Sequence, residues 1–339
     1  MEDNAYCIIL VGGEGKRLWP ISDKKKPKPF LPLITEKTLI EETVNRIKDI
    51  FPKERIKFVL SNKYKTLCSK IFPYFTEENY IIEPCPRDTS AAIGLSLKYT
   101  PDDSTLVVLS SDHYVSDKEN FQRQILSGAK FLENNPDFVL VFGIKPKRPE
   151  AGYGYVKRKE PLDDGIFKVE RFFEKPNKED AKVYLKNPNY FWNAGIFIFR
   201  KKRMEELFSI HLPEHCKVIL DSEIKDQRFK SLEKISIDYG IMEKIDTIGM
   251  IEGDFLWDDI GSYNSLSRIH RPDENKNLVF GDCTGISTKN CIIWSDNGKI
   301  VTIGVSGLVI AYCDGRVLVA KKERVDEIKG LVDIIENED

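Results

Sequence analysis

The first strongly apolar run of the chain, residues 6–11, ends directly at a glycine-rich stretch. A short run of apolar and β-branched residues bounded by glycines is typical of a buried strand in a parallel sheet. Residues 39–50 carry apolar side chains at helical spacing, and residues 56–61 again have the pattern of a strand, with a further helix expected over residues 67–75. We therefore expect a strand–helix–strand unit, which the apolar runs 106–109 and 138–144 extend to an α/β fold with a mostly parallel sheet flanked by helices.

The pattern changes beyond residue 150. Three segments between residues 152 and 199 are aromatic strands interrupted by glycines. Beyond residue 275, short alternating strands follow one another too closely for crossover helices, and a helix is expected over residues 325–335. The sequence thus predicts a large domain over residues 1–270 and a small β domain with a terminal helix over residues 275–339.

A glycine-rich loop with two basic residues follows the first strand, in the order Val11-Gly12-Gly13-Glu14-Gly15-Lys16-Arg17. Glycines let backbone amides approach an anion closely, and Lys16 and Arg17 add positive charge. The loop is not a dinucleotide fingerprint, because Leu18 stands where the third glycine is needed. It is not a Walker loop either, because Arg17 takes the place of the Ser or Thr. A solvated glycine turn is the plain alternative to a phosphate loop.

A second basic element lies a few residues further on, at Lys24-Lys25-Lys26-Pro27-Lys28-Pro29. Proline fixes its own backbone angle, so the two prolines would hold Lys28 at a defined place. We expect Lys28 and the glycine loop to form one cradle for a polyphosphate.

Two acidic turns are candidates for a metal site. Asp112 follows the apolar strand 106–109, and ligands of open parallel sheets bind beyond the carboxyl ends of the strands. Magnesium takes one or two carboxylates together with substrate phosphates, so it suits a carboxylate at this place. An aspartate after a strand is otherwise most often a turn or a helix cap. The second turn contains Asp258 and Asp259, and a simple Asp-Gly turn would also explain it.

Composition excludes several classes of protein. Of 339 residues, 52 are Lys or Arg and 54 are Asp or Glu, and the resulting net charge of −2 argues against a general nucleic-acid binder. No apolar stretch reaches the length of a membrane span, and the N-terminus lacks the pattern of a signal peptide. The seven cysteines show no paired metal motif, so a cytoplasmic protein with reduced cysteines is expected.

Two strings carry a resemblance to a known family, Gly-Gly-x-Gly-x-Arg-Leu-Trp-Pro-x-Ser and Pro-Lys-x-Phe-Leu-Pro-Leu. They resemble the signature of the sugar-1-phosphate nucleotidyltransferases, and most closely that of the mannose-1-phosphate guanylyltransferases. The family usually has Ala at Val11, Thr at Lys16 and Gln at Pro29. The resemblance covers roughly residues 6–270. It implies a Rossmann-like nucleotidyltransferase fold and a β-helix-like C-terminal appendage.

The resemblance also implies roles for individual residues. Arg17, Lys28 and Lys175 are the expected catalytic residues. Nucleotide binding is expected from Val11, Gly12, Gly13, Gly15, Lys16, Glu83, Arg87, Asp88, Thr89 and Ser110. The sugar phosphate is expected to contact Gly154, Glu174, Asn193, Gly195 and Asp238. Asp112 and Asp259 are the expected Mg²⁺ ligands, and Asp258 is a weaker candidate.

By the same resemblance, the expected substrates are GTP and mannose 1-phosphate, the expected assembly is a homodimer, and neither nucleic acid nor membrane is a partner. An enzyme of the same fold for another nucleotide or sugar, such as a heptose-1-phosphate guanylyl or a glucose-1-phosphate uridylyl enzyme, is one alternative. A catalytically silent GDP-mannose sensor is the other. Longer relatives carry an added isomerase domain, and no isomerase activity is expected here.

Overall fold

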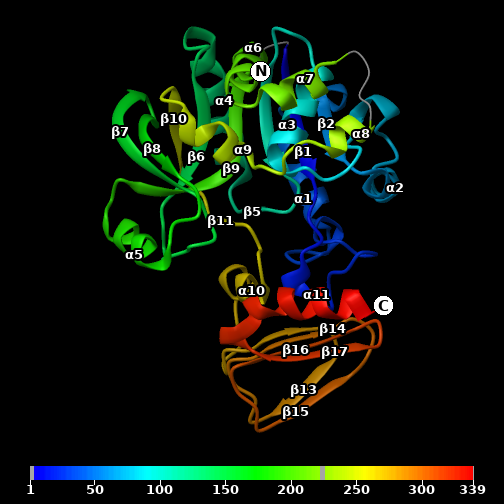
Figure 1. Ribbon diagram of the computed structural model, residues 1–339. Coiled ribbons are helices and arrows are strands. Elements are labelled where there is room, and N and C mark those ends of the chain that lie inside the picture. The colour runs from blue at the N-terminus through cyan, green and yellow to red at the C-terminus, as the bar shows by residue number, and fades with distance from the viewer. Residues whose placement is uncertain (1–3, 222–225, 339) are drawn as a thin grey trace. The chain divides into compact units, whose positions relative to one another are not determined.

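The computed structural model describes residues 4–221 and 226–338, and their contacts divide the chain into two compact units (Figure 1). The first unit contains the first strand, Val44–Ser111 and Val115–Trp257. The second contains Gly12–Thr43, Asp112–Tyr114 and the chain from Asp258 onward. By contacts, the glycine loop therefore belongs with the C-terminal β module, although the sequence suggests a border between residues 270 and 275.

Among the described residues, nine strands form the sheet of the first unit in the order β3-β2-β1-β4-β9-β6-β10-β8-β7. Their bounds are β1 Ala5–Val11, β2 Ile56–Leu60, β3 Tyr80–Ile82, β4 Thr105–Ser110, β6 Val139–Ile144, β7 Tyr155–Asp163, β8 Ile166–Phe173, β9 Tyr190–Arg200 and β10 Ile248–Gly253. Strands β1 to β4 are parallel, as is the pair β6–β10, whereas β9 runs antiparallel to both β4 and β6. The predicted α/β fold is confirmed, with the aromatic strands joining the same sheet.

Helices cover both faces of this sheet. The longer ones are α2 Asn62–Ile71, α3 Asp88–Lys98, α4 Lys118–Asn134, α5 Lys178–Lys186 and α6 Lys201–His211. Shorter ones are α7 Pro213–Ile219, α8 Asp226–Lys230 and α9 Ile237–Gly240, while α1 Leu39–Ile47 spans the border between the units. Strand β9 shows the two faces. Phe197 and Phe199 lie in the core cluster that contains α3 and α6, whereas Ile198 packs against Gly128 of α4. Residues of alternating parity on a strand point to opposite faces.

The second unit contains a module of short, mostly parallel strands. They are β12 Leu278–Phe280, β13 Cys283–Ile286, β14 Ile292–Ser295, β15 Ile300–Ile303, β16 Leu308–Cys313 and β17 Arg316–Lys321. Leu278 pairs with Ile292, and Ile292 pairs with Val309, so apolar side chains stack from one coil to the next. Within the described part of this module, the last pair, β16–β17, is antiparallel. Parallel pairing of such closely spaced strands is the pattern of a β-helix.

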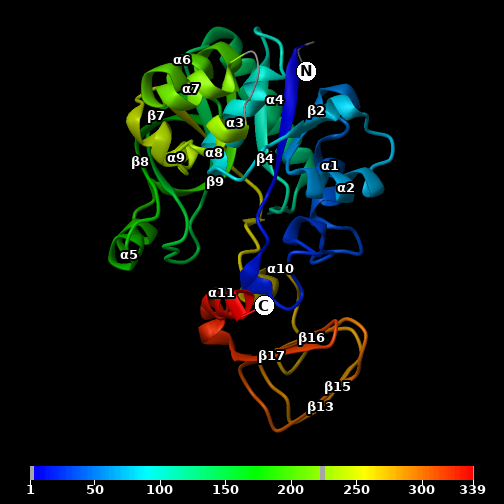
Figure 2. The same ribbon diagram turned by 45° about the vertical axis from the view of Figure 1, so that its right-hand side comes forward.

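The module ends in helical segments that close its core. These are α10 Tyr263–Ile269, η6 Lys322–Glu327 and α11 Ile328–Glu338. In both views α11 lies beside the strands β16 and β17 (Figure 2). Val325, Ile328 and Val332 are buried in one cluster with Val309 and Leu18, the latter from the segment that follows the glycine loop. The loop is thus anchored on the C-terminal module. No described helix combines the length and the apolar character needed to cross a lipid bilayer.

Candidate active site

The glycine loop has a backbone that only glycine adopts without strain. Gly13 and Gly15 have φ of +82° and +74°. A Cβ on Gly13 would meet nothing within 4 Å, whereas a Cβ on Gly15 would lie 2.6 Å from Cβ of Lys28. Ser22 supports the loop, because its hydroxyl donates to the Gly15 carbonyl at 2.5 Å. The loop is therefore packed directly against the stem of Lys28.

Lys28 brings the two acidic turns together. It lies in the 3-10 turn η2 (Lys28–Phe30), and its side chain is only 8% exposed. The ammonium lies 2.8 Å from Oδ2 of Asp112 and also donates to the main-chain oxygen of Asp259. Oδ1 of Asp259 accepts a hydrogen bond from the amide of Gly261 at 3.1 Å. The residues predicted as the cradle lysine and the metal aspartates are thus neighbours.

Asp258, in contrast to Asp259, forms a buried structural ion pair. It is only 4% exposed and forms a two-pronged ion pair with Arg268, one contact of which is 2.9 Å long. Its Oδ1 also accepts from the amide of Ile260 at 2.9 Å. A buried carboxylate needs such partners to offset its desolvation. Both carboxylate oxygens of Asp258 are thus engaged by donors of the protein itself.

The donor set suits magnesium. Asp112 and Asp259 offer hard oxygen ligands, and Mg²⁺ in phosphoryl-transfer sites needs only one or two carboxylates because the substrate phosphates and water complete its shell. Among the described residues, the cluster of three metal-type ligands lies elsewhere, at Asp296, Cys313 and Asp314. That cluster already holds a cation, since the ammonium of Lys26 lies 3.3 Å from Asp296 and 3.1 Å from Asp314.

The two cations of the loop face carboxylates of the C-terminal helical segments η6 and α11. The ammonium of Lys16 lies 2.7 Å from Oδ1 of Asp333, and Nε of Arg17 lies 3.8 Å from Oδ1 of Asp326. Arg17 and Asp326 are both well exposed, so solvent weakens their attraction. Both cations have carboxylate partners, and a polyphosphate would have to compete for them.

The five residues predicted to contact the sugar phosphate lie together in the first unit. The Asn193 side chain donates to Oδ1 of Asp238 at 2.9 Å, and its own oxygen accepts from the amide of Gly195 at 3.1 Å. The Asn193 amide donates to the carbonyl of Gly154 at 2.8 Å. A Cβ on Gly154 would lie 2.6 Å from Oε2 of Glu174, so the glycine lets that carboxylate lie directly against the backbone. The sequence strings that suggested this set meet in space.

Charges in this group are closely linked. The ammonium of Lys175 lies 2.7 Å from Oε1 of Glu174, whose side chain is only 6% exposed. Burial and the negative charge of Glu174 raise the pKa of Asp238 to about 7. Burial acts to lower the pKa of Lys175, but its hydrogen bond to Glu174 and the negative charges of Glu174 and Asp238 together outweigh burial, so the pKa of Lys175 is raised. Raised carboxyl pKa values in a cluster of polar groups are typical of functional sites.

The predicted base-binding segment follows β3 and opens helix α3. Burial raises the pKa of Glu83 to about 7, although a hydrogen bond from the amide of Arg87 opposes the shift. The Arg87 guanidinium donates to the carbonyl of Lys230, yet its Nε is buried without a hydrogen-bond partner among the described residues. A buried donor of this kind is available to a ligand.

Thr89 and its neighbours connect this segment to the sugar-phosphate group. Thr89 accepts a hydrogen bond from the amide of Ile237 at 2.9 Å, next to Asp238. The amide of Thr89 in turn donates to Oδ1 of Asp88 at 2.7 Å. The hydrogen bond between Thr89 and Ile237 holds the predicted base-reading loop beside helix α9.

Two further predicted nucleotide contacts end neighbouring strands. Ser110 ends β4 in register with Leu10, one residue before Val11 ends β1. Val11 and Ser110 thus lie at the carboxyl ends of two adjacent parallel strands, as expected for a ligand-facing edge.

Three non-glycine residues, each either a predicted site residue or next to one, have positive φ angles. They are Asp88 at +69°, Lys175 at +47° and Ile260 at +47°. Such a backbone is unusual for a β-branched residue like Ile260, and conformations of this kind cluster at functional sites. Ile260 follows Asp259 directly, so the strain is located where the second acidic turn presents its carboxylate.

Sequence reasoning did not assign two supporting residues. Ser22 holds the Gly15 carbonyl, and it is the final serine of the signature string, which could have revealed it. Glu243 accepts a hydrogen bond from the amide of Glu174 at 2.8 Å, and it lies only five residues beyond Asp238 in the sequence.

Two family models match most of the chain. A family model described as nucleotidyl transferase matches residues 6–276, and a model of the MannoseP isomerase/GMP-like beta-helix domain matches residues 281–334. The mannose-1-phosphate guanylyltransferase of Salmonella montevideo is 32% identical to 98% of this chain and matches over 74% of its own length. That of Escherichia coli K12 is 29% identical, with the same two coverages.

Among solved structures, a mannose-1-phosphate geranyltransferase from Thermus thermophilus is similar with a TM-score of 0.89. It is 34% identical, and the match covers 98% of this chain and 99% of that one. On the extent of the family match and of these relatives, the chain belongs to the nucleotidyl transferase family.

Proposed function

We propose that the protein is a mannose-1-phosphate guanylyltransferase, which transfers GMP from GTP to mannose 1-phosphate and releases GDP-mannose and pyrophosphate. Relatives with this name match nearly the whole chain at about 30% identity. The observation that carries the proposal within the chain is the cluster of Lys28 with Asp112 and Asp259 beside the glycine loop. The cluster combines a cation, hard oxygen ligands for a metal ion and a glycine loop whose backbone amides a phosphate can approach. A site for a nucleoside triphosphate requires these features.

The reaction needs positioning and charge neutralisation more than proton transfer. An oxygen of the sugar phosphate forms a bond to the α-phosphorus of GTP, and the bond from that phosphorus to the bridging oxygen breaks as pyrophosphate leaves. A phosphate monoester is already anionic near neutral pH, so no general base is required. Bringing two anions together is then the main barrier, and fixed cations and aligned substrates lower it.

Each cation has a separate task in this proposal. Lys28 neutralises the α-phosphate, and its burial keeps its ammonium in place. Arg17 and Lys16 hold the leaving pyrophosphate, exchanging their present carboxylate partners Asp326 and Asp333 for phosphate oxygens.

Asp112 and Asp259 would hold Mg²⁺, which when bound neutralises charge on the phosphates.

The sugar phosphate is recognised by the group around Asn193. Glu174 accepts from sugar hydroxyls, Asn193 can both donate and accept, and Lys175 orients the incoming phosphate. Asp238 fixes the Asn193 amide through its 2.9 Å hydrogen bond. Gly154 leaves room for the Glu174 carboxylate, and Gly195 lets the sugar ring approach the backbone.

The base and the triphosphate are recognised by two other segments. The polar groups that read the base belong to Glu83, Arg87, Asp88 and Thr89. The loop amides at Gly12 and Gly13 contact the phosphates.

We also propose a homodimer that works in the cytoplasm. All seven cysteines are free, which suits a reducing compartment. The β module exposes aliphatic side chains that a second copy could cover, among them Ile286, Ile303 and Val319, each more than 60% exposed.

A substrate panel tests the proposal. Pyrophosphate release is measured with four nucleoside triphosphates against mannose, glucose and heptose 1-phosphates, with and without Mg²⁺. We expect the highest kcat/KM for GTP with mannose 1-phosphate. A clear preference for another nucleotide and sugar phosphate would mean that the protein is a nucleotidyltransferase with different substrates. Tight GDP-mannose binding without Mg²⁺-dependent pyrophosphate release would instead indicate a sensor and refute the enzymatic proposal.

A further inference from the structure

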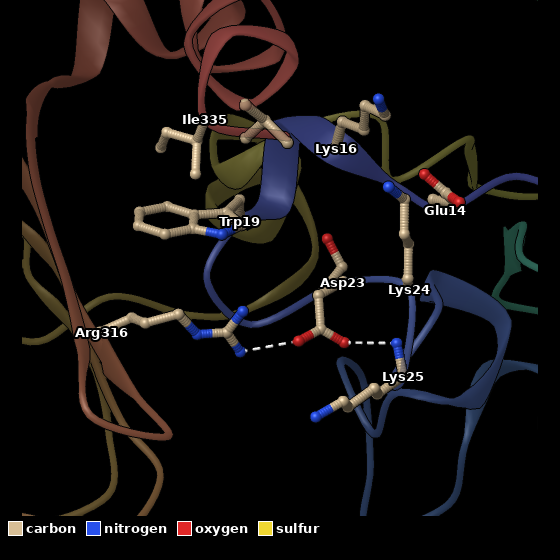
Figure 3. Close-up of a pocket in the computed structure, with 10 residues that line it drawn as sticks. Glu14, Lys16, Trp19, Asp23, Lys24, Lys25, Arg316 and Ile335 are labelled. Atoms are coloured by element: carbon tan, nitrogen blue, oxygen red, sulfur yellow. Dashed lines mark hydrogen bonds and ion pairs between the residues drawn. The ribbon is translucent and has the colours of Figure 1, made fainter. Parts of the chain in front are cut away.

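A second pocket lies in the C-terminal unit, between the segment after the glycine loop and helix α11 (Figure 3). Its volume is about 320 Å³, at the lower end of the range of small-molecule sites. The lining residues are Glu14, Lys16, Trp19, Ser22, Asp23, Lys24, Lys25, Arg316, Val332 and Ile335. Neither Lys28 nor the acidic turns at Asp112 and Asp259 belong to this lining, so it is a different cavity from the proposed reaction centre.

The lining combines positive charge with an aromatic wall. Four of the lining side chains are basic and two are acidic, and two further carboxylates lie close by, Asp333 beside Lys16 and Asp314 beside Arg316. Figure 3 shows the Trp19 ring beside Ile335, with the Arg316 guanidinium reaching past the ring toward Asp23. The Arg316 guanidinium lies 5.9 Å from the centre of the Trp19 ring. An apolar wall with convergent cations is suited to an organic molecule that carries an anionic group.

Arg316 is held in place with most of its donors still available. Its terminal nitrogen donates to Oδ2 of Asp23 at 2.7 Å, the one hydrogen bond that the described residues give this guanidinium, and Oδ2 of Asp314 lies 3.8 Å from the same nitrogen. A guanidinium has five N–H donors, so four remain for an anion. Asp23 in turn is fixed by the amides of Lys25 and Lys26, both 2.7 Å from its Oδ1. The pocket therefore has a preoriented arginine, the residue best suited to phosphate.

The lysines complete the site. Lys25 lies in an exposed turn, and within the described parts of the chain no carboxylate pairs with its ammonium. The side chain of Lys24 ends beside Glu14 in the close-up (Figure 3). A phosphate monoester could thus bind Arg316 through paired hydrogen bonds, with the lysines as further cations.

We propose that this pocket binds a phosphorylated small molecule, with its phosphate on Arg316, Lys24 and Lys25 and its organic part against Trp19 and Ile335. The pocket shares Lys16 with the proposed pyrophosphate contacts, but its lining contains none of Lys28, Asp112 and Asp259.

Occupation of the pocket has a direct consequence for the glycine loop. Lys16 lines the pocket and also lies 2.7 Å from Asp333 of α11. A phosphate bound nearby competes with Asp333 for this cation and changes the charge presented to a triphosphate. The pocket is therefore placed to act as an effector site that alters the apparent affinity for the nucleotide.

Binding is tested directly by isothermal titration calorimetry on the full chain. Adenosine monophosphate, glucose 6-phosphate and inorganic phosphate are the three probes, and each titration is repeated with excess GDP-mannose to fill the substrate site. The test variant is the double substitution Lys24→Gln with Lys25→Gln. Lys299→Gln, an exposed lysine of the same unit, is the matched control. Melting curves of all variants verify that they are folded.

We expect at least one of the two organic phosphates to bind in the presence of GDP-mannose. The double variant should weaken this binding by about tenfold or more, because two charged contacts are lost, while Lys299→Gln should leave it unchanged. As a second readout, the probe should change tryptophan fluorescence in the wild type but not in Trp19→Phe. The proposal is overturned if GDP-mannose abolishes the binding, if the double variant binds normally, or if only inorganic phosphate binds.

Discussion

Adding one methyl group to Gly15 should disturb the site in a way that the same change at Gly13 does not. Both glycines have left-handed backbone angles, so an alanine at either position costs about 1–2 kcal/mol in backbone strain. At Gly13 the new methyl group meets open space. At Gly15 it lies 2.6 Å from Cβ of Lys28, closer than real side-chain contacts, and overpacking of this kind costs a further 1–3 kcal/mol, roughly.

Gly15→Ala should therefore lower the free energy of unfolding by about 2–5 kcal/mol, and Gly13→Ala by about 1–2 kcal/mol. Urea denaturation measures the unfolding free energy of each variant. The experiment is done without substrates, because a bound phosphate would itself stabilise the loop. Gly15→Ala should also lower kcat, because the new methyl group displaces the Lys28 side chain. A Lys28→Met variant, which lacks the ammonium, gives the reference value of kcat for a lost lysine. Equal destabilisation by the two alanines would refute the packing of the loop against Lys28.

Three further predictions concern the surroundings of the site. Arg268→Met leaves the buried carboxylate of Asp258 without its ion pair, so we expect a loss of about 3–5 kcal/mol in unfolding free energy by urea denaturation, with kcat retained in the folded fraction. Asp238 keeps its proton to about pH 7 when folded but loses it near 3.8 when unfolded, so it weakens folding as pH rises between these values. Asp238→Asn should therefore lose less stability than the wild type between pH 4 and 7, roughly, in melting curves, while the KM for mannose 1-phosphate rises. Removal of divalent ions with EDTA should abolish pyrophosphate release, and Mg²⁺ should restore it; unchanged release in EDTA would exclude the metal role of Asp112 and Asp259.

Local sequence signals are sufficient for the elements on which the site is built. The run before Gly12 forms the central strand β1, and the apolar segment at residues 106–109 lies within β4, because short apolar runs between glycines and turns have few alternatives to a buried strand. One predicted helix is misplaced. The pattern indicates residues 67–75, but the helix lies at Asn62–Ile71, because Ser61 caps its start by accepting from the amide of Tyr64.

Long-range pairings could not be read from the sequence. Lys16 and its partner Asp333 are 317 positions apart, and nothing in either segment announces the other. Asp258 and Asp259 look alike in the sequence, and only the fold assigns Arg268 to the first and the neighbourhood of Lys28 to the second. The role of each charged residue depends on such distant partners. The phosphate-binding character of the glycine and lysine motif, in contrast, follows from its own residues.

If Asp112 supports guanylyl transfer and has no structural role, its replacement should affect turnover and leave the fold intact. The decisive measurement is GDP-mannose formation from GTP and mannose 1-phosphate by the wild type and by Asp112→Asn, with saturating Mg²⁺. We expect the variant to melt close to the wild-type temperature but to lose about a hundredfold or more in kcat. Wild-type turnover by a folded Asp112→Asn protein would show that Asp112 does not take part in the reaction.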